Sequence, residues 1–398
     1  MSLQKSNAWK YYLALLAGFA SLAIFFYLGN HYYQLNLGLS SGPAICNLNQ
    51  TFNCDTVTAS KYSVLFGIPI AIWGLATQII LILLTLVFTL NLSSDRNRIG
   101  RYTLFLSLFV SLMSLIMGSI SLFFLSTYCL FCILTYFLNF LHLALIWNLQ
   151  ENSPFSTFQK DIVAAFTNLK WVGISIISIV PFTLLFNDMF LEHFGGSLLK
   201  DTVESSVSAW QSAPLINFSN DGLSKGPTDA KMTIVEFADF LCPHCKHAAP
   251  SLKVFKDSHT NVRVIFKAFP LDGSCNASNQ MPKGDGTRCL LSKTVFCAEK
   301  LAQKGWLFYE DIFERQEEFQ VPGSASELLK NLTVKNGIDA VTMDDCRNSE
   351  ATHKSIVAQS QEGINANIEG TPAIFVNGKL LLRGHLLPVL QKVLDLNE

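Results

Sequence analysis

Five long apolar stretches in the first half of the chain limit its fold more than any other feature. They occupy residues 11–28, 66–90, 102–125, 129–147 and 171–186. A helix needs about 20 predominantly apolar residues to cross a bilayer, and the last stretch reaches that length if it extends back towards Ile162. It contains Pro181, which a membrane helix tolerates when neighbouring groups satisfy the freed carbonyl. We therefore expect an all-α transmembrane four-helix bundle plus a fifth transmembrane helix.

Charged residues are distributed unevenly between the two halves. Residues 1–190 contain 8 Lys and Arg and 5 Asp and Glu, whereas residues 191–398 contain 21 and 25. The second half therefore has the composition of a water-soluble globular domain. The net charge of −1 argues against a nucleic-acid-binding protein, which presents a basic surface. The hydrophobic content of 50% excludes an intrinsically disordered chain.

Lys and Arg are enriched in the short cytoplasmic loops of membrane proteins. Here they occur before the first stretch, between the second and third, and between the fourth and fifth: Lys5, Lys10, Arg96, Arg98, Arg101, Lys160 and Lys170. The opposite loops contain only Lys61. The distribution predicts a cytoplasmic N-terminus and a C-terminal half outside the cytoplasm. A cleaved signal peptide is the less favoured interpretation of the first stretch, because no clear cleavage site follows it.

Two cysteine pairs have C-x-x-C spacing, Cys129 with Cys132 and Cys242 with Cys245. This spacing is typical of redox or zinc sites. In the orientation above, all ten cysteines lie at or beyond the extracytoplasmic face of the membrane, which is the oxidising side in a bacterium. A shared zinc site would have to join a membrane helix to the soluble half, so we favour redox chemistry and expect no bound metal.

The soluble half shows a regular order of elements. Residues 191–226 contain Gly, Ser and Pro and are interpreted as a linker, with 197–210 as a short amphipathic helix on the membrane. We then expect strands at 232–237 and 261–269, a helix from Cys242 to about Ser258, a Gly- and Asp-rich loop at 271–289, a helical block at 291–361, strands at 373–376 and 380–383 joined by an Asn377–Gly378 turn, and a final helix.

The sequence Cys242-Pro-His-Cys245 follows a predicted strand and opens a predicted helix. A helix N-terminus favours a thiolate, which is the nucleophile of disulfide exchange, and His244 can add positive charge. Because a stabilised thiolate favours the reduced form, the disulfide form is expected to be a strong oxidant.

Residues 227–398 resemble the DsbA-type thiol oxidases of the thioredoxin superfamily. The resemblance rests on the Cys-Pro-His-Cys motif, on the helical block between two strand pairs, and on Thr371-Pro372 just before a strand. It implies an α/β thioredoxin fold with an inserted helical domain, Cys242 as the exposed attacking sulfur, and Cys245 as the buried resolving one. It also implies a cis bond before Pro372 and Glu236 as a buried proton partner beneath Cys245.

The other four cysteines of the soluble half allow three pairings. Cys275 and Cys289 bracket a Gly-rich loop, so closure of this loop is the simplest pairing, and Cys297 and Cys346 then join two helices of the inserted block. Because they lack C-x-x-C spacing, we interpret them as structural disulfides that contribute about 3–4 kcal/mol each.

The C-x-x-C pair of the membrane half begins the fourth apolar stretch. At positions i and i+3 of a helix, Cys129 and Cys132 share one face. Ser126 or Thr127 is the expected N-cap of that helix, whose N-terminus again favours a thiolate.

Residues 10–150 resemble the vitamin K epoxide reductase (VKOR) family. The resemblance rests on Cys46 and Cys54 between the first two stretches, then Ser60, then the run at 66–69 (Phe-Gly-Ile-Pro), then Cys129 and Cys132. Bacterial members of that family are often fused through a fifth span to a thioredoxin-like domain, which matches the order of segments here.

The VKOR resemblance implies a role for each membrane cysteine. Cys46 exchanges with the thioredoxin-like domain, Cys54 passes electrons to Cys129, and Cys132 lies against a quinone, either ubiquinone or menaquinone. Ser60 is implied to hydrogen-bond the quinone, although its position is equally typical of a helix cap. Three aromatic residues are candidates to line the pocket, although aromatics in spans more often pack or anchor: Trp73, Phe131 and Tyr136.

We therefore expect a thiol:disulfide oxidoreductase of the bacterial inner membrane that introduces disulfide bonds into periplasmic proteins. Electrons would pass from Cys242/Cys245 through the membrane cysteines to a quinone. The expected domains are 1–150 (VKOR-like), 151–190 (cytoplasmic loop and fifth helix), 191–226 (linker) and 227–398 (DsbA-like). The expected partners are reduced client proteins, quinone and membrane lipid, but no nucleic acid.

Two other functions remain open from the sequence. One is a transmembrane reductant conduit that keeps the thioredoxin-like domain reduced for isomerisation, although it would need a cysteine pair reachable from the cytoplasm. The other is a tethered chaperone module with purely structural cysteines, although a C-x-x-C pair at a helix start is a poor structural crosslink.

Overall fold

The computed structural model describes residues 8–39, 44–48, 51–125, 127–150, 158–167, 169–278 and 281–397. The chain divides into two compact units, Met1–Leu35 with Pro43–Ser197 and Asn36–Gly42 with Leu198–Glu398. The first unit is mainly helical, with one short hairpin, and the second combines a five-stranded sheet with helices.

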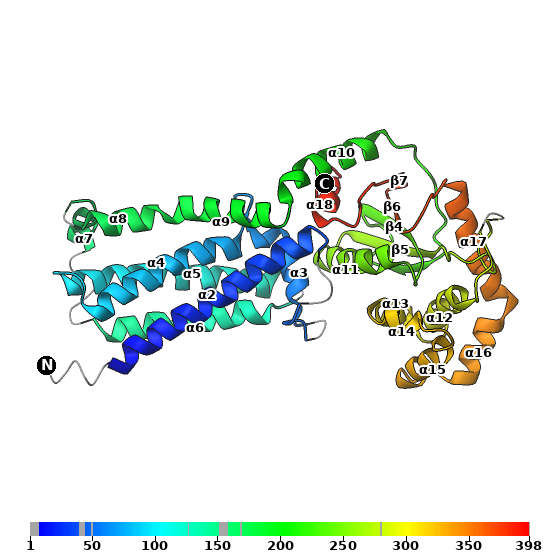
Figure 1. The fold of residues 1–398 in the computed structure, drawn as a ribbon, viewed down its shortest axis with the longest axis horizontal. Coiled ribbons are helices and arrows are strands. Elements are labelled where there is room, and N and C mark those ends of the chain that lie inside the picture. Colours follow the sequence, from blue (N-terminus) through cyan, green and yellow to red (C-terminus); the bar gives the residue numbers. More distant parts are fainter. Residues whose placement is uncertain are drawn as a thin grey trace. The chain divides into compact units, whose positions relative to one another are not determined.

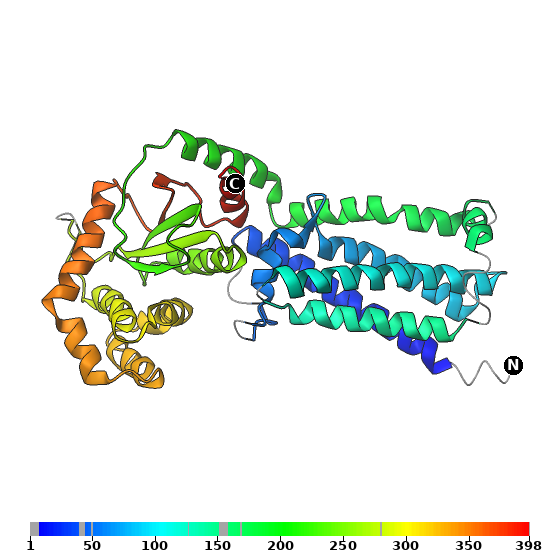
Figure 2. The same ribbon diagram turned by 180° about the vertical axis from the view of Figure 1, so that it is seen from behind.

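Long apolar helices that run side by side build the first unit (Figures 1 and 2). They are α2 (Ala8–Asn36), α4 (Ile70–Leu90), α5 (Arg96–Phe124), α6 (Leu130–Asn148), α8 (Lys170–Ile177) and α9 (Ile179–His193). With α8 and α9 taken as one segment, the described part of the chain has five helices long and apolar enough to cross a membrane. The predicted helical first half with five candidate spans is therefore confirmed.

The fifth span differs from its predicted limits. It runs over Lys170–His193, so it extends towards the C-terminus and not back towards Ile162. Phe158–Phe166 instead form a separate helix, α7, which folds back onto α8. A Cβ at Gly173 would lie 2.6 Å from the Ala165 carbonyl oxygen, so only glycine fits there. The break between α8 and α9 falls just before Pro181, whose nitrogen cannot donate a helical hydrogen bond.

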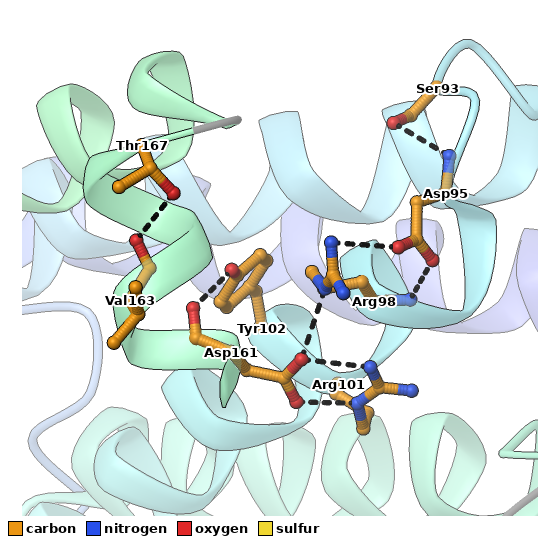
Figure 3. A network of polar contacts seen from close by, with 8 residues as sticks. All are labelled: Ser93, Asp95, Arg98, Arg101, Tyr102, Asp161, Val163 and Thr167. Atoms are coloured by element: carbon orange, nitrogen blue, oxygen red, sulfur yellow. Dashed lines mark hydrogen bonds and ion pairs between the residues drawn. The ribbon is translucent and has the colours of Figure 1, made fainter. Parts of the chain in front are cut away.

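A polar network joins α7 to the start of α5 (Figure 3). The buried Asp161 carboxylate accepts hydrogen bonds from Arg98 Nε at 3.1 Å and from Arg101 Nε and Nη2 at 2.6 and 2.8 Å. The Tyr102 hydroxyl donates to the Asp161 carbonyl oxygen at 2.5 Å. Because a buried carboxylate is tolerated only when it is paired and hydrogen-bonded, these contacts hold α7 against α5.

The segment between α2 and α4 is short and irregular. It contains α3 (Cys54–Ala59), a 3₁₀ turn (Lys61–Ser63), and a hairpin of β1 (Val64–Leu65) with β2 (Ile68–Pro69). Phe66 and Gly67 form the hairpin turn with φ of 53° and 78°, the left-handed conformation that such turns require. For this reason α4 begins at Ile70 and not at Phe66, where the apolar stretch begins.

The second unit contains a five-stranded sheet in the order β3–β5–β4–β6–β7. The strands are β3 (Leu223–Lys225), β4 (Met232–Ala238), β5 (Val262–Ala268), β6 (Ala373–Val376) and β7 (Lys379–Leu380). β4 pairs in parallel with β5 and antiparallel with β6, and all but one residue of each central strand is buried. The predicted strands at 232–237, 261–269 and 373–376 are confirmed, whereas the predicted strand at 380–383 is reduced to two residues.

Helices pack on this sheet and form the inserted block between β5 and β6 (Figures 1 and 2). The helices outside the block are α10 (Leu199–Ser212), α11 (Pro243–Ser258) and α18 (Leu387–Asp395). The block between β5 and β6 consists of α12 (Thr287–Ala302), α13 (Gly305–Glu314), α14 (Gln316–Phe319), α15 (Ala325–Lys335), α16 (Ala340–Asn348) and α17 (Glu350–Asn365). A buried cluster that includes Phe240, Phe266, Phe308 and Phe313 joins the sheet to the block. The order of elements is that of a thioredoxin fold with a helical insertion.

Helix α10 corrects the prediction of a linker with a membrane-surface helix at 197–210. Trp210 is buried, and its indole N–H donates to the Val376 carbonyl of β6 at 3.0 Å. Arg383 donates to the Thr202 hydroxyl at 3.1 Å. The apolar face of α10 is therefore covered by the sheet unit itself, and β3, also within 191–226, adds a strand to the sheet edge.

Candidate redox site

Cys242 is the N-cap of α11, at the end of the loop that follows β4. Its backbone N–H donates to the Asp239 carbonyl, and its own carbonyl accepts from the N–H groups of Cys245 and Lys246, each at 3.1 Å. Pro243 occupies the first helical position, where a missing N–H has no partner to lose. The motif therefore places both sulfurs at a helix N-terminus.

The two thiols of this motif have opposite environments. The hydrogen bond from the Cys245 thiol and the backbone N–H groups of Cys245 and His244 lower the pKa of Cys242 to about 5. Burial raises the pKa of Cys245. Cys245 has no exposed surface, and Cys242 is only 7% exposed, which is less open than the resemblance implies. At neutral pH, Cys242 is therefore the thiolate and Cys245 the thiol.

Thr371 and Pro372 lie beside Cys242, although they are far away in the sequence. The peptide bond between them is cis, and Cys242 Sγ lies 3.3 Å from the Thr371 carbonyl oxygen, to which it donates when it is protonated. His244 lies exposed between the two cysteines.

Glu236 lies in β4 with no exposed surface, and burial raises its pKa to about 7. The hydroxyl of Tyr309 on α13 donates to its Oε2 at 2.8 Å, and Oε1 has no partner among the described residues. Tyr309 and Cys245 belong to the same buried cluster. An acid with a pKa near 7 can exchange a proton at neutral pH. The sequence carries no signal for Tyr309, because an aromatic residue in a helical block is typical of a core.

Two further side chains position the loop before α11 and were not predicted. Gln316 donates from Nε2 to the carbonyls of Phe240 and Cys242 at 2.8 and 3.0 Å. Arg288 forms an ion pair with the fully buried carboxylate of Asp239. Both contacts come from the inserted block or the loop that leads into it, so the block supports the redox motif.

The remaining cysteines of this unit form two disulfides, Cys275–Cys289 and Cys297–Cys346. The first closes the loop that precedes α12, and the second joins α12 to α16. This is the pairing that loop closure favours in the sequence.

In the first unit, a disulfide joins Cys46 to Cys54, whereas Cys129 and Cys132 are thiols. Cys46, Cys54 and Cys129 are 1%, 0% and 2% exposed and pack in one buried cluster, with Cys132 packed against it. The fold therefore brings together two cysteine pairs that lie far apart in the sequence.

Backbone pairing aligns the segments that carry Cys54 and Cys129. The Tyr128 N–H donates to the Thr51 carbonyl at 2.8 Å, and the Asn53 N–H donates to the Tyr128 carbonyl at 3.0 Å. Asn53 and Tyr128 immediately precede Cys54 and Cys129, so the two cysteines enter the cluster from paired segments.

Cys129 is itself the N-cap of α6, since its sulfur accepts from the backbone N–H of Cys132 at 3.2 Å. The prediction of Thr127 as the cap was wrong, because Tyr128 is extended in a bridge to Phe52 and the helix begins at Leu130. Ser126, the alternative, lies outside the described residues.

The predicted quinone-contacting residues differ in the hydrogen bonds they make. Ser60 is the C-cap of α3, and its hydroxyl donates to the Val57 carbonyl at 2.8 Å. The indole N–H of Trp73 donates to a backbone carbonyl of the hairpin. Tyr136, one turn after Cys132 on α6, makes no hydrogen bond to the described residues through its hydroxyl.

A low-pKa thiolate next to a buried thiol at one helix start is the chemistry of thiol–disulfide exchange. Here the two thiols lie at the start of the helix that follows strand β4 of a thioredoxin-like sheet. The same chain also has apolar spans with two more cysteine pairs in one cluster. This combination defines a membrane-associated thiol–disulfide oxidoreductase.

Two parts of the chain match known protein families. Residues 12–147 match the vitamin K epoxide reductase family, and residues 233–395 match the DSBA-like thioredoxin domain. The chain therefore belongs to the DsbA-like disulfide bond formation proteins and carries a VKOR domain before its thioredoxin domain.

Individual relatives match parts of the chain. It is 30% identical over 164 residues to Disulfide bond formation protein D of Bacillus subtilis, a match that covers 39% of this chain and 68% of that protein. A 26% match to Na(+)/H(+) antiporter NhaA 3 of Salinispora tropica covers 39% of this chain but 21% of the antiporter. The crystal structure of oxidised BdbD from Bacillus subtilis aligns with a TM-score of 0.39 and 22% identity, over 46% of this chain and 97% of that one.

Proposed function

We propose that the protein introduces disulfide bonds into extracytoplasmic proteins and passes the electrons through its membrane cysteines to a quinone. The observation that supports this most is the buried cluster in which the Cys46–Cys54 disulfide packs with Cys129. Sulfurs packed in one cluster can exchange disulfides without large motion.

The first step takes place on the thioredoxin-like unit. A client thiolate attacks Cys242 and breaks the Cys242–Cys245 bond. The buried Cys245 thiolate then takes a proton, and Glu236 is the candidate donor because its pKa is raised to about 7. A second client thiolate then displaces Cys242. The client gains a disulfide, and the Cys242/Cys245 pair holds two electrons. The lowered pKa of Cys242 makes it a good leaving group and so favours this direction.

The second step moves these electrons to the membrane unit. The Cys242 thiolate attacks Cys46, and Cys54 leaves as a thiolate. Cys245 then displaces Cys46, which restores the Cys242–Cys245 disulfide and leaves Cys46 and Cys54 reduced. The single chain that joins the two units keeps Cys242 at a high effective concentration for this exchange.

The third step is internal to the membrane unit. Cys54 attacks Cys129 of a Cys129–Cys132 disulfide, and Cys132 leaves. Cys46 then displaces Cys129 from Cys54, so the Cys46–Cys54 disulfide forms again and both electrons rest on Cys129 and Cys132. The protons of the attacking thiols balance those taken up by the leaving thiolates.

Residues around Cys132 have the chemistry to hold a quinone. A quinone carbonyl accepts hydrogen bonds, and the Tyr136 hydroxyl is a donor whose proton no described residue uses. Ser60 can donate only if it gives up its bond to Val57, so Tyr136 is the stronger candidate. A bound quinone would supply a two-electron acceptor for the Cys129/Cys132 pair. We place the protein in a bacterial inner membrane with its N-terminus cytoplasmic, on the Lys and Arg distribution.

The direct test is quinone reduction by the full-length protein in detergent, driven by a reduced thiol client. We expect quinol from the native protein and none from Cys132→Ala. The matched control is Cys297→Ala with Cys346→Ala, which removes two cysteines outside the relay and keeps activity where the protein is folded. No quinol from a folded protein with an intact Cys242–Cys245 disulfide would contradict the proposed direction.

A further inference from the structure

The loop that carries Cys46 and Cys54 is closed twice. The first closure is the disulfide itself. The second is the side chain of Asn47: its Oδ1 accepts from the Cys54 backbone N–H at 2.7 Å, and its Nδ2 donates to Asp55 Oδ2 at 2.7 Å. This second closure contains no sulfur, so reduction of the disulfide does not remove it.

Helix α2 anchors both ends of the same loop. His31 Nε2 and Asp55 Oδ1 are 2.6 Å apart, and each residue is 5% exposed. One turn earlier, the Tyr27 hydroxyl accepts from the Ile45 backbone N–H at 3.2 Å, and the Tyr27 ring is parallel to the His31 ring. Ile45 and Asp55 are the direct neighbours of Cys46 and Cys54.

The same tyrosine also contacts the other cysteine pair. The Tyr27 ring packs edge-on against Phe131, with centroids 5.2 Å apart, and Phe131 lies between Cys129 and Cys132 in the sequence. One face of α2 therefore contacts residues next to Cys46, Cys54 and Cys132.

We propose that Tyr27, His31, Asn47 and Asp55 form a clasp that holds Cys46 and Cys54 in register whenever their disulfide is open. The inference rests on the proposed function, in which this disulfide opens and closes in every cycle. An open loop without the clasp would gain conformational freedom, and the two sulfurs would meet less often. His31 and Asp55 are positioning residues and do not touch the reacting atoms.

The clasp has a measurable consequence for the redox equilibrium. Two thiols held close together form a disulfide more readily, so the clasp favours the Cys46–Cys54 disulfide over its dithiol. Because a buried polar group that loses its hydrogen-bond partner is costly, Asp55→Asn and His31→Gln should both weaken the clasp. Each should shift the pair towards the dithiol at least tenfold, which is about 30 mV for a two-electron couple.

The test is a glutathione titration of the full-length protein in detergent. Differential alkylation and peptide mass spectrometry measure the fraction of Cys46 and Cys54 that is joined in a disulfide, separately from the other cysteines. Neither a client nor a quinone is therefore needed. The matched controls are Asp188→Asn and His193→Gln, which change exposed residues of α9 and should leave the equilibrium unchanged. Because the readout is independent of the relay, failure of quinone reduction and failure of the clasp are separate results.

An equilibrium equal to that of the native protein in folded Asp55→Asn and His31→Gln would overturn the proposal. If these variants do not fold, the same titration is made on Asn47→Ala, which removes only the hydrogen bonds of Asn47 to Cys54 and Asp55. A shift in Asn47→Ala supports the clasp, and no shift in that variant refutes it.

Discussion

The backbone N–H of Asn53 donates to the carbonyl of Tyr128 at 3.0 Å, across 75 positions of the chain. Each residue directly precedes a cysteine of the membrane cluster. The bond therefore pairs the approach to Cys54 with the approach to Cys129.

This pairing predicts a selective crosslink. In Cys46→Ser with Cys132→Ser, the remaining Cys54 and Cys129 should join when the full-length protein is treated with a mild oxidant. In Cys54→Ser with Cys132→Ser, the remaining Cys46 should join Cys129 at least tenfold less, because its segment is not paired with Tyr128. Peptide mass spectrometry measures both bonds, and equal yields would contradict the order of exchange.

The thiolate of Cys242 should control the pH dependence of its reactivity. With a pKa of about 5, its alkylation rate should fall to half near pH 5, whereas an ordinary thiol does so near 8.5. A lowered pKa in the folded state contributes stability that is fully present above about pH 8.5 and is lost as the pH falls through 5. The thermal stability of the reduced protein should therefore fall over this range relative to that of the disulfide form. A half-rate near pH 8.5 would refute this assignment.

Glu236 should act on stability with the opposite sign. Its pKa is raised to about 7, so the folded state favours the protonated carboxyl, and stability is lost as the pH rises through 7. Glu236→Gln should remove this loss, because the amide has the same shape but does not titrate. Thermal unfolding of both proteins between pH 5 and 8 measures the difference.

Tyr309→Phe tests the partner of Glu236. The phenol hydrogen bond lowers the pKa of Glu236 against the effect of burial, so its loss should move the pH profile of disulfide exchange at Cys242/Cys245 to higher pH. Tyr62→Phe, in the first unit, is the matched control and should not move the profile. An unchanged profile in Tyr309→Phe would mean that Glu236 does not govern the exchange.

Asp161 should be the main stabilising residue at the contact of α7 with α5. Asp161→Asn removes the negative charge that two arginines share, and we expect a loss of about 2 kcal/mol, less than for a fully buried pair because both arginines are partly exposed. Asp188→Asn, on an exposed position of α9, should have little effect. The melting temperature in detergent measures both, and equal values would show that α7 is held by apolar contacts alone.

Much of this architecture follows from the sequence by itself. The spans could be predicted because the hydropathy of about 20 consecutive residues is a local property. The position of Cys242 at a helix start could be predicted because a β-branched run, a proline and a helical pattern occur within a few residues of it. Local patterns also marked Asn377–Gly378 as a turn and indicated the pairing of Cys275 with Cys289.

Only the tertiary structure decided the partners of these groups. Tyr309 contacts Glu236 across 73 positions, and His31 contacts Asp55 across 24; neither pair has a spacing that a helix or a strand would produce. The docking of α10 on the sheet depends on the Trp210 contact with Val376, 166 positions away. Local patterns place residues on elements, whereas the burial of a polar group selects its partner from the whole folded chain.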